Sequence, residues 1–379
     1  MRWRGLLGCL LFLCLIQLAQ ADPEVEIIYP PKRFKRIKYS GYVDVSYNYL
    51  VRSRHLTSGV NNRLYDLEVN GPTLQQFLLN AATKPRSDWG MSITTVIGRD
   101  ANELAPAGYN PNVFNIQNVG FAVPEAFVQY SREPFVVKIG AIRSLAGLET
   151  YDYRKNANFS RSILDNYAQP GEHVGVRSLA RVNDKLSIIV GAFNGWSTIK
   201  QSGTFGAAEL GLSYFLRKSI TLMIDGYTGD QHLTDKTSRG PFSRRNLIDM
   251  YAVWHATDKL RFSTNIDYGW QNKASLPNKV IGQAIWKGIG VYSSYMLSDQ
   301  WEGSVRGEVF SDSDGYRTGV KQNWRELTLT LRWLLRKNFY IDAETRHDFS
   351  NVPAFVDRNG VRVNNNQQSY ALEALYRFG

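Results

Sequence analysis

Cysteine is almost absent from this chain of 379 residues. The two that occur, Cys9 and Cys14, lie within an apolar stretch near the amino terminus, from Leu6 to Leu18. The remainder of the chain therefore offers no disulfide, no thiolate nucleophile and no cysteine ligand for zinc. A lipid-anchored protein would need its cysteine directly after the apolar stretch, which disfavours that class as well.

Long hydrophobic runs are also missing. Beyond the first 21 residues, no stretch approaches the roughly 20 apolar residues that a membrane-spanning helix needs. Mean hydropathy is −0.32, although 13% of the residues are aromatic. If the chain crosses a membrane, it must cross as strands, because a barrel hides polar residues in its lumen and places aromatic rings at the two interfaces.

Known catalytic motifs do not occur either. There is no G-x-S-x-G and no H-E-x-x-H, and His347 and Asp348 are neighbours whose side chains would point to opposite faces of a strand. Residues 312–315 begin like a calcium loop but lack its later ligands, so an Asx-type turn is favoured. We expect no enzyme activity, no cofactor and no metal site. The five histidines are scattered: His55, His173, His232, His255 and His347.

The amino terminus has the features of an export signal. Arg2 and Arg4 precede the apolar stretch, and residues 19–21 form an A-x-A cleavage site. We expect residues 1–21 to be a cleaved signal peptide and residues 22–39 to be a basic periplasmic arm. An uncleaved membrane anchor is the rival interpretation, and the short apolar stretch argues against it.

From residue 40 onward, apolar and polar residues alternate with a period of two. In 260–270, 324–335 and 339–349, one face is apolar or aromatic and the other carries most of the charges. This period is typical of strands and not of helices. Polar turns of three or four residues separate many of these segments, and they lie at Pro85–Asp88, Arg132–Pro134, Asn183–Lys185, Arg217–Ser219, Thr257–Lys259, Ser298–Gln300 and Arg336–Asn338.

Longer connections alternate with these turns, at residues 52–73, 99–119, 143–172, 195–206, 229–245, 272–283, 312–323 and 350–367. Seven short turns and eight long loops give sixteen strands, with both ends of the chain on the short-turn side. We therefore predict an all-β fold for residues 40–379, a transmembrane antiparallel up-and-down β-barrel with short periplasmic turns and long extracellular loops. A soluble β-sandwich, the rival fold, has no use for loops of such unequal length.

The alternation also predicts which side chains face the lumen, and sixteen strands enclose enough width for an aqueous channel. Candidates for lining the pore are Lys138, Arg177, Arg181, Asp267, Arg306, Glu308, Glu326, Arg332, Asp342, Glu344 and Arg346. Further inward candidates are Asp44, Glu209, Asp225, Arg261, Glu302, Asp348, Glu373 and Arg377. Such charges would orient polar solutes, or they would pair with one another and only solvate the wall.

The third long connection, residues 143–172, is the longest. A loop of about thirty residues in a compact protein is usually functional or disordered. Its charges are balanced, and the candidates for a constriction are Glu149, Asp152, Arg154, Lys155, Arg161, Asp165 and Glu172.

Several stretches resemble the OmpL-like β-barrel porin family: residues 135–140, 158–162, 167–177, 184–186, 191–196, 310–319 and 365–378. The resemblance spans about residues 40–378, and it implies a pore whose long third loop folds into the lumen. It implies no particular solute. One departure is that Phe378 is followed by Gly379, whereas barrels of this kind usually end in an aromatic residue.

Taken together, these features predict a porin in the outer membrane of a Gram-negative bacterium. It would pass small hydrophilic solutes or ions by diffusion through a charged lumen narrowed by residues 143–172. The alternative is a non-conducting structural or adhesin-like barrel. Expected partners are outer-membrane lipid, the barrel assembly machinery and the solutes, and a homo-oligomer is left open. Nucleic acid is not expected, because the net charge of +11 is dispersed and the chain is exported.

Overall fold

The computed structural model describes residues 37–379 except 52–62, 84–87, 106–109, 115, 117, 199–202, 204, 233–241, 278–279 and 358–360. The expected signal peptide and residues 22–36 of the expected arm lie outside this part of the chain. Among the described residues, no helix is long and apolar enough to cross a membrane.

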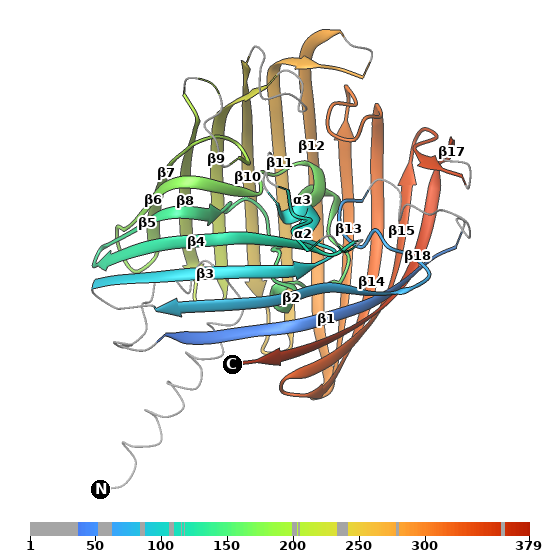
Figure 1. Ribbon diagram of the computed structural model, residues 1–379, viewed down its shortest axis with the longest axis horizontal. Helices are drawn as coiled ribbons and strands as arrows, with labels where there is room; N and C mark the ends of the chain where they lie inside the picture. Colours follow the sequence, from blue (N-terminus) through green and yellow to red (C-terminus); the bar gives the residue numbers. More distant parts are fainter. Residues whose placement is uncertain are drawn as a thin grey trace, which may run out of the picture.

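Sixteen antiparallel strands form a closed barrel, as the alternation predicts (Figure 1). Neighbours in sequence are neighbours in the barrel, and β1 closes it against β18, with Gly41 opposite Phe378. The strands are β1 (Lys38–Leu50), β2 (Pro72–Thr83), β3 (Asp88–Gly98), β4 (Gly120–Arg132), β5 (Phe135–Arg143), β6 (Glu172–Arg181), β7 (Leu186–Phe193), β8 (Ala207–Arg217), β9 (Ile220–His232), β10 (Phe242–His255), β11 (Leu260–Ser275), β12 (Ile281–Ser298), β13 (Trp301–Asp312), β14 (Gln322–Arg336), β15 (Phe339–Ser350) and β18 (Asn366–Phe378).

The short connections lie where the sequence predicts them, and the first strand begins and the last strand ends on their side of the barrel. Two long connections are shorter than expected, because β9 and β10 extend to residues 232 and 242, and β11 and β12 to 275 and 281. Pairing thus continues beyond the length that a membrane requires. In the described parts of the long loops lie four small elements: α2 (Ala101–Leu104), η2 (Tyr153–Lys155), α3 (Ile163–Tyr167), and the hairpin of β16 (Phe355–Val356) with β17 (Arg362–Asn364).

The two faces of each strand differ as a membrane barrel requires. In β14, Trp324, Glu326 and Thr328 are buried, while the exposed fractions of Leu327 and Leu329 are 48% and 44%. Polar side chains therefore turn inward and apolar ones outward. Aromatic pairs mark the short-turn side, including Trp89 with Tyr130, Trp254 with Phe262, and Trp301 with Trp333.

Asp312 adopts the Asx-type role that the sequence favours. Its carboxylate accepts hydrogen bonds from the backbone N–H groups of Tyr316, Arg317 and Thr318 at 3.0, 3.0 and 2.7 Å. The side chain thus holds the loop that follows β13 in a compact turn.

Candidate functional site: a loop anchored inside the barrel

The third long loop, residues 144–171, lies inside the barrel, where α3 appears among the strands (Figure 1). Tyr153, Phe159, Ile163 and Leu164 are almost completely buried. Tyr153 and Phe159 pack with inward-facing wall residues such as Leu375, and Ile163 and Leu164 pack with Trp286. The infolding implied by the family resemblance is therefore confirmed.

The first attachment joins the start of the loop to β9 and β10. The backbone N–H of Leu145 donates to the Tyr227 hydroxyl at 2.8 Å, and the N–H of Gly147 donates to Asp249 Oδ1 at 3.1 Å. Behind them, Arg177 forms a two-pronged ion pair with Glu209, at 2.6 and 2.8 Å. These contacts orient the chain as it leaves β5.

The second attachment fixes η2 to the opposite wall, on β1 and β2. Gln76 Nε2 donates to the carbonyl of Tyr151 at 3.1 Å, and the N–H of Tyr153 donates to the Tyr42 hydroxyl at 3.1 Å. The Tyr153 hydroxyl donates to Asp100 Oδ2 at 2.7 Å. Burial raises the pKa of Asp100 to about 6, although Gln76 and Tyr153 donate to its carboxylate.

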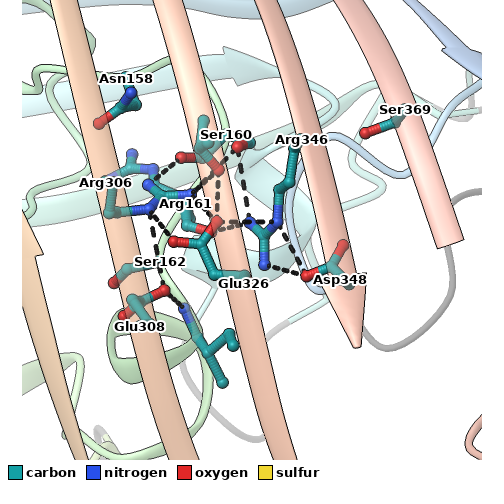
Figure 2. Close-up of polar contacts among 12 residues, drawn as sticks. Asn158, Ser160, Arg161, Ser162, Arg306, Glu308, Glu326, Arg346, Asp348 and Ser369 are labelled. Atoms are coloured by element: carbon teal, nitrogen blue, oxygen red, sulfur yellow. Dashed lines mark hydrogen bonds and ion pairs between the residues drawn. The ribbon is translucent and has the colours of Figure 1, made fainter. Parts of the chain in front are cut away.

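The third attachment is an ion network on β13, β14 and β15 (Figure 2). Arg306, which is fully buried, donates to Glu326 at 2.8 Å on the next strand. It also donates to Glu149 at 2.7 Å and to the carbonyl of Ser160 at 2.6 Å, both in the loop. One guanidinium therefore links the wall to two separate points of the loop, and its charge is balanced by buried carboxylates.

Two wall carboxylates accept hydrogen bonds from the loop backbone. Glu344 accepts from the N–H groups of Phe159 and Ser160 at 2.8 and 3.1 Å. Glu308 accepts from the N–H groups of Ile163 and Leu164 at 2.6 and 3.3 Å, where α3 begins. These N–H groups have no partner within so short a helix, so Glu308 satisfies donors that burial would otherwise leave unpaired.

Arg346 adds to the same sector. Its guanidinium donates to the carbonyl of Arg161 at 2.6 Å, and it pairs with Asp348 at 2.8 Å (Figure 2).

The fourth attachment holds the end of the loop against β11 and β12. Gln169 Nε2 donates to Asn265 and Asp267, both at 2.8 Å. The Trp286 indole N–H donates to the carbonyl of Ala168 at 3.0 Å. The loop is thus bonded to four sectors of the wall before it returns to β6.

Each of the eleven pore-lining candidates lies on the inward face of its strand. Arg306, Glu308, Glu344, Arg346 and Asp267 touch the third loop directly, and Glu326 contacts it through Arg306. Arg332 also reaches the loop, since it donates to the carbonyl of Asn156 at 3.4 Å, and it pairs with Asp342 at 2.7 Å. Of the others, Arg177 pairs with Glu209, Arg181 pairs with Asp184 at 3.0 Å, and the Lys138 ammonium lies 4.6 Å from the Phe127 ring centroid. That they line an open path stays a prediction.

The seven loop candidates divide between anchors and accessible groups. Glu149 and Arg161 are buried against the wall, whereas Lys155 is exposed. Arg154 pairs with Asp152 at 2.6 Å, and its guanidinium keeps the pKa of that carboxyl below the usual range although burial acts to raise it. The remaining two lie near Arg143: Asp165 is 3.8 Å from it, and Glu172 begins β6 opposite it.

Several anchors are absent from the sequence-based set, namely Tyr42, Gln76, Asp100, Tyr227 and Asp249. Tyr42, Gln76 and Tyr227 occupy inward positions of their strands, but uncharged side chains were not among the candidates. Periodicity alone carries enough information to place them inward. It carries none about which loop residue each would meet.

Like charges also face one another on the inner wall. Asp225, Asp249 and Asp267 are directly opposite across β9, β10 and β11. Among the described residues, both carboxylate oxygens of Asp225 lack a hydrogen-bond partner, as do both of Asp44. Ionised carboxylates that face one another in this way repel, so the arrangement is destabilising when all three are charged.

Comparison with known proteins agrees with this fold. The sequence profile of the family described as "Putative beta-barrel porin-2, OmpL-like" matches residues 36–378. No curated protein matches this chain in sequence.

Solved structures are similar in fold at low identity. The outer membrane channel DcaP of Acinetobacter baumannii has a TM-score of 0.62 at 12% identity, over 92% of this chain and 100% of that one. OmpF of Salmonella typhi, in complex with daunomycin, has a TM-score of 0.57 at 11% identity, over 90% and 97%. OmpT of Vibrio cholerae, in a trimer form, has a TM-score of 0.55 at 8% identity, over 90% and 99%.

Proposed function

Because this chain belongs to the OmpL-like family of β-barrel porins and is integral to the outer membrane, we propose that it is a channel through which small hydrophilic solutes or ions diffuse passively. The observation that carries the proposal is the third loop. It lies inside a barrel of sixteen strands, and this position supports a lumen that the loop would narrow to a polar constriction. No residue is assigned a catalytic role.

Hydrated passage needs polar groups along the route, and the inner wall supplies them. Inward side chains that keep some exposed surface, such as Arg181, Arg261 and Glu302, would exchange hydrogen bonds with water or solute. Arg306, Glu326 and Glu308 would set the shape of the constriction rather than bind a solute, because the loop already occupies them.

One observation favours the second candidate, a non-conducting barrel. The loop is bonded to four sectors of the wall, and most of its side chains are buried. A loop held so tightly would also serve as a plug beneath extracellular loops that bind a surface.

Planar-bilayer recording of the purified protein separates the two candidates. A channel gives steps of conductance above the background of the detergent alone. If no such steps appear, the result supports the plugged barrel and contradicts the channel. Removing part of residues 145–168 should raise the conductance if this loop forms the constriction. Since that deletion removes much of the packed interior, Glu344→Gln serves as a milder companion that weakens one anchor and keeps its shape.

The proposal includes export and assembly. Residues 1–21 would be removed as a signal peptide, and residues 22–39 would extend into the periplasm, before insertion by the barrel assembly machinery. Tyr370, Leu372, Tyr376 and Phe378 would form its recognition strand, and a charged tail added after Gly379 should slow insertion. A homo-oligomer is proposed by analogy with the trimer form of the Vibrio cholerae protein, and cross-linking in the membrane tests it.

A further inference from the structure

Cationic side chains gather on the periplasmic side of the third loop. Arg154 and Lys155 belong to η2, Arg332 lies near the end of β14, and Arg377 lies two residues from the end of the chain. We call these four residues the periplasmic cation cluster. They come from three segments that are far apart in sequence and meet at the short-turn end of the barrel.

Two tyrosines of the wall bring the guanidinium groups together. The Arg332 and Arg377 guanidinium carbons lie 4.1 and 5.4 Å from the ring centroid of Tyr340. The Arg154 guanidinium carbon lies 5.2 Å from the centroid of Tyr42, and the backbone of Tyr42 is directly opposite that of Arg377. The aromatic faces support cations that would otherwise repel one another.

Only half of the cluster is neutralised. Asp152 accepts two hydrogen bonds from the Arg154 side chain, at 2.8 and 2.6 Å, and Asp342 pairs with Arg332 at 2.7 Å. Within the described part of the chain, no carboxylate lies within ion-pair distance of Arg377 or Lys155. The Nε of Arg377 is buried and has no hydrogen-bond partner there.

The other charged residues nearby do not cancel the excess positive charge that an ion arriving from the periplasm would meet. Asp44 and Glu373 lie deeper in the barrel and are at most 1% exposed. Glu302 is directly opposite Arg332 on the neighbouring strand, and Arg261 lies close enough to both to interact with their charges. Lys155, in contrast, is exposed.

We propose that the periplasmic cation cluster is a binding site for small organic or inorganic dianions, such as a dicarboxylate or a phosphate, at the inner entrance of the barrel. Guanidinium and ammonium groups are the donors that carboxylate and phosphate oxygens prefer. Arg377 and Lys155 supply the unpaired donors, while Arg154 and Arg332, which are held by Asp152 and Asp342, border the site from fixed positions. The inference rests on the proposed channel, since the site lies on the route of a diffusing solute.

Calorimetric titration of the purified full-length barrel in detergent tests the site without any need for conduction. Succinate is the carboxylate probe, inorganic phosphate the phosphate probe, and glucose the neutral comparison. Saturable binding of a dianion is expected, and glucose should give none. Arg377→Gln and Lys155→Gln should each weaken that binding about fivefold, as expected for one partly solvated ion pair.

The matched control is Arg336→Gln, which removes an exposed arginine at the end of β14 and should leave binding unchanged. Because Lys155 is exposed, its variant keeps the fold even if the Arg377 variant does not, and migration of the unheated barrel on a gel verifies folding. Equal binding by the Lys155 variant, or no saturable binding by the parent protein, would overturn the site.

Conductance, measured separately, distinguishes this inference from the proposed function. If the barrel binds succinate but passes no current, the binding site is supported and the channel is contradicted. If the barrel conducts without saturable binding, the channel is supported and the binding site is contradicted.

Discussion

At the scale of single residues, we expect Arg306 to contribute most to the stability of the barrel interior. It is fully buried between Glu149, Glu326 and Glu308, and removing one partner of a buried ion network leaves uncompensated charge in a low-dielectric site. We therefore expect Arg306→Gln to lower the free energy of unfolding by about 3–5 kcal/mol. Denaturant titration of the folded barrel in lipid vesicles measures this change.

A matched control is Arg181→Gln, whose ion-pair partner Asp184 is 95% exposed. Exposed pairs contribute about 0–1 kcal/mol, so this variant should unfold close to the parent. Similar losses in both variants would mean that burial of Arg306 is not the source of the effect.

Asp100 gives the stability a specific dependence on pH. Burial raises its pKa from 3.8 to about 6 in the folded state. Between these values the folded chain binds more protons than the unfolded chain, so the contribution of Asp100 is complete below about pH 4 and is lost as the pH rises through 6. The loss is on the order of 3 kcal/mol.

Asp100→Asn keeps an acceptor for Gln76 and Tyr153 but cannot ionise. Unfolding free energies measured from pH 4 to 7 should therefore fall less steeply for this variant than for the parent. Parallel curves would contradict a raised pKa at Asp100.

At the scale of elements, the first N–H groups of α3 and those of the segment before it donate to acceptors of the wall. Glu344 accepts from the N–H groups of Phe159 and Ser160, which have no other partner among the described residues. Glu344→Ala should expose these amides to solvent and accelerate their hydrogen exchange by tenfold or more, because about 1–3 kcal/mol is lost for each buried group left unpaired.

Hydrogen exchange followed by mass spectrometry of peptides that cover residues 156–166 measures this effect. Glu302→Ala, on the same inner wall but nearer the short turns, is the control and should leave those peptides protected. Unchanged exchange in the Glu344 variant would show that neighbouring contacts hold the segment without it.

At the scale of the whole molecule, the outer face of the barrel must suit lipid. Leu329 lies at the middle of β14, with 44% of its surface exposed on the apolar side. An arginine at mid-membrane depth costs about 2–4 kcal/mol, and near an interface about 0–1 kcal/mol. Leu329→Arg should therefore weaken folding into lipid vesicles far more than Leu297→Arg, beside the short turn after β12.

Equilibrium folding into vesicles, followed by tryptophan fluorescence, measures both variants. Equal costs at Leu329 and Leu297 would contradict the depth assigned to the two positions.

Most of the barrel could be predicted from local pattern. A period of two together with turn residues specifies each strand and each hairpin, and antiparallel neighbours in sequence become neighbours in space. The sequence predicts β9 to β12 to be shorter than they are, because pairing above the membrane continues into residues without a regular apolar face. The candidate site was only partly predictable, since Arg306 and Glu308 follow from alternation but their loop partners do not.

The sequence by itself determined the class of fold, the number of strands and the side of the wall on which each charge lies, because these depend on neighbours in the chain. Only the tertiary structure decided that the third loop meets β1, β9, β11 and β13 to β15. It also decided that Arg154, Arg332 and Arg377 share one end of the lumen. The hydrogen bonds of the loop with these strands join residues at least 82 positions apart, and the closure of the barrel that creates them has no local signal.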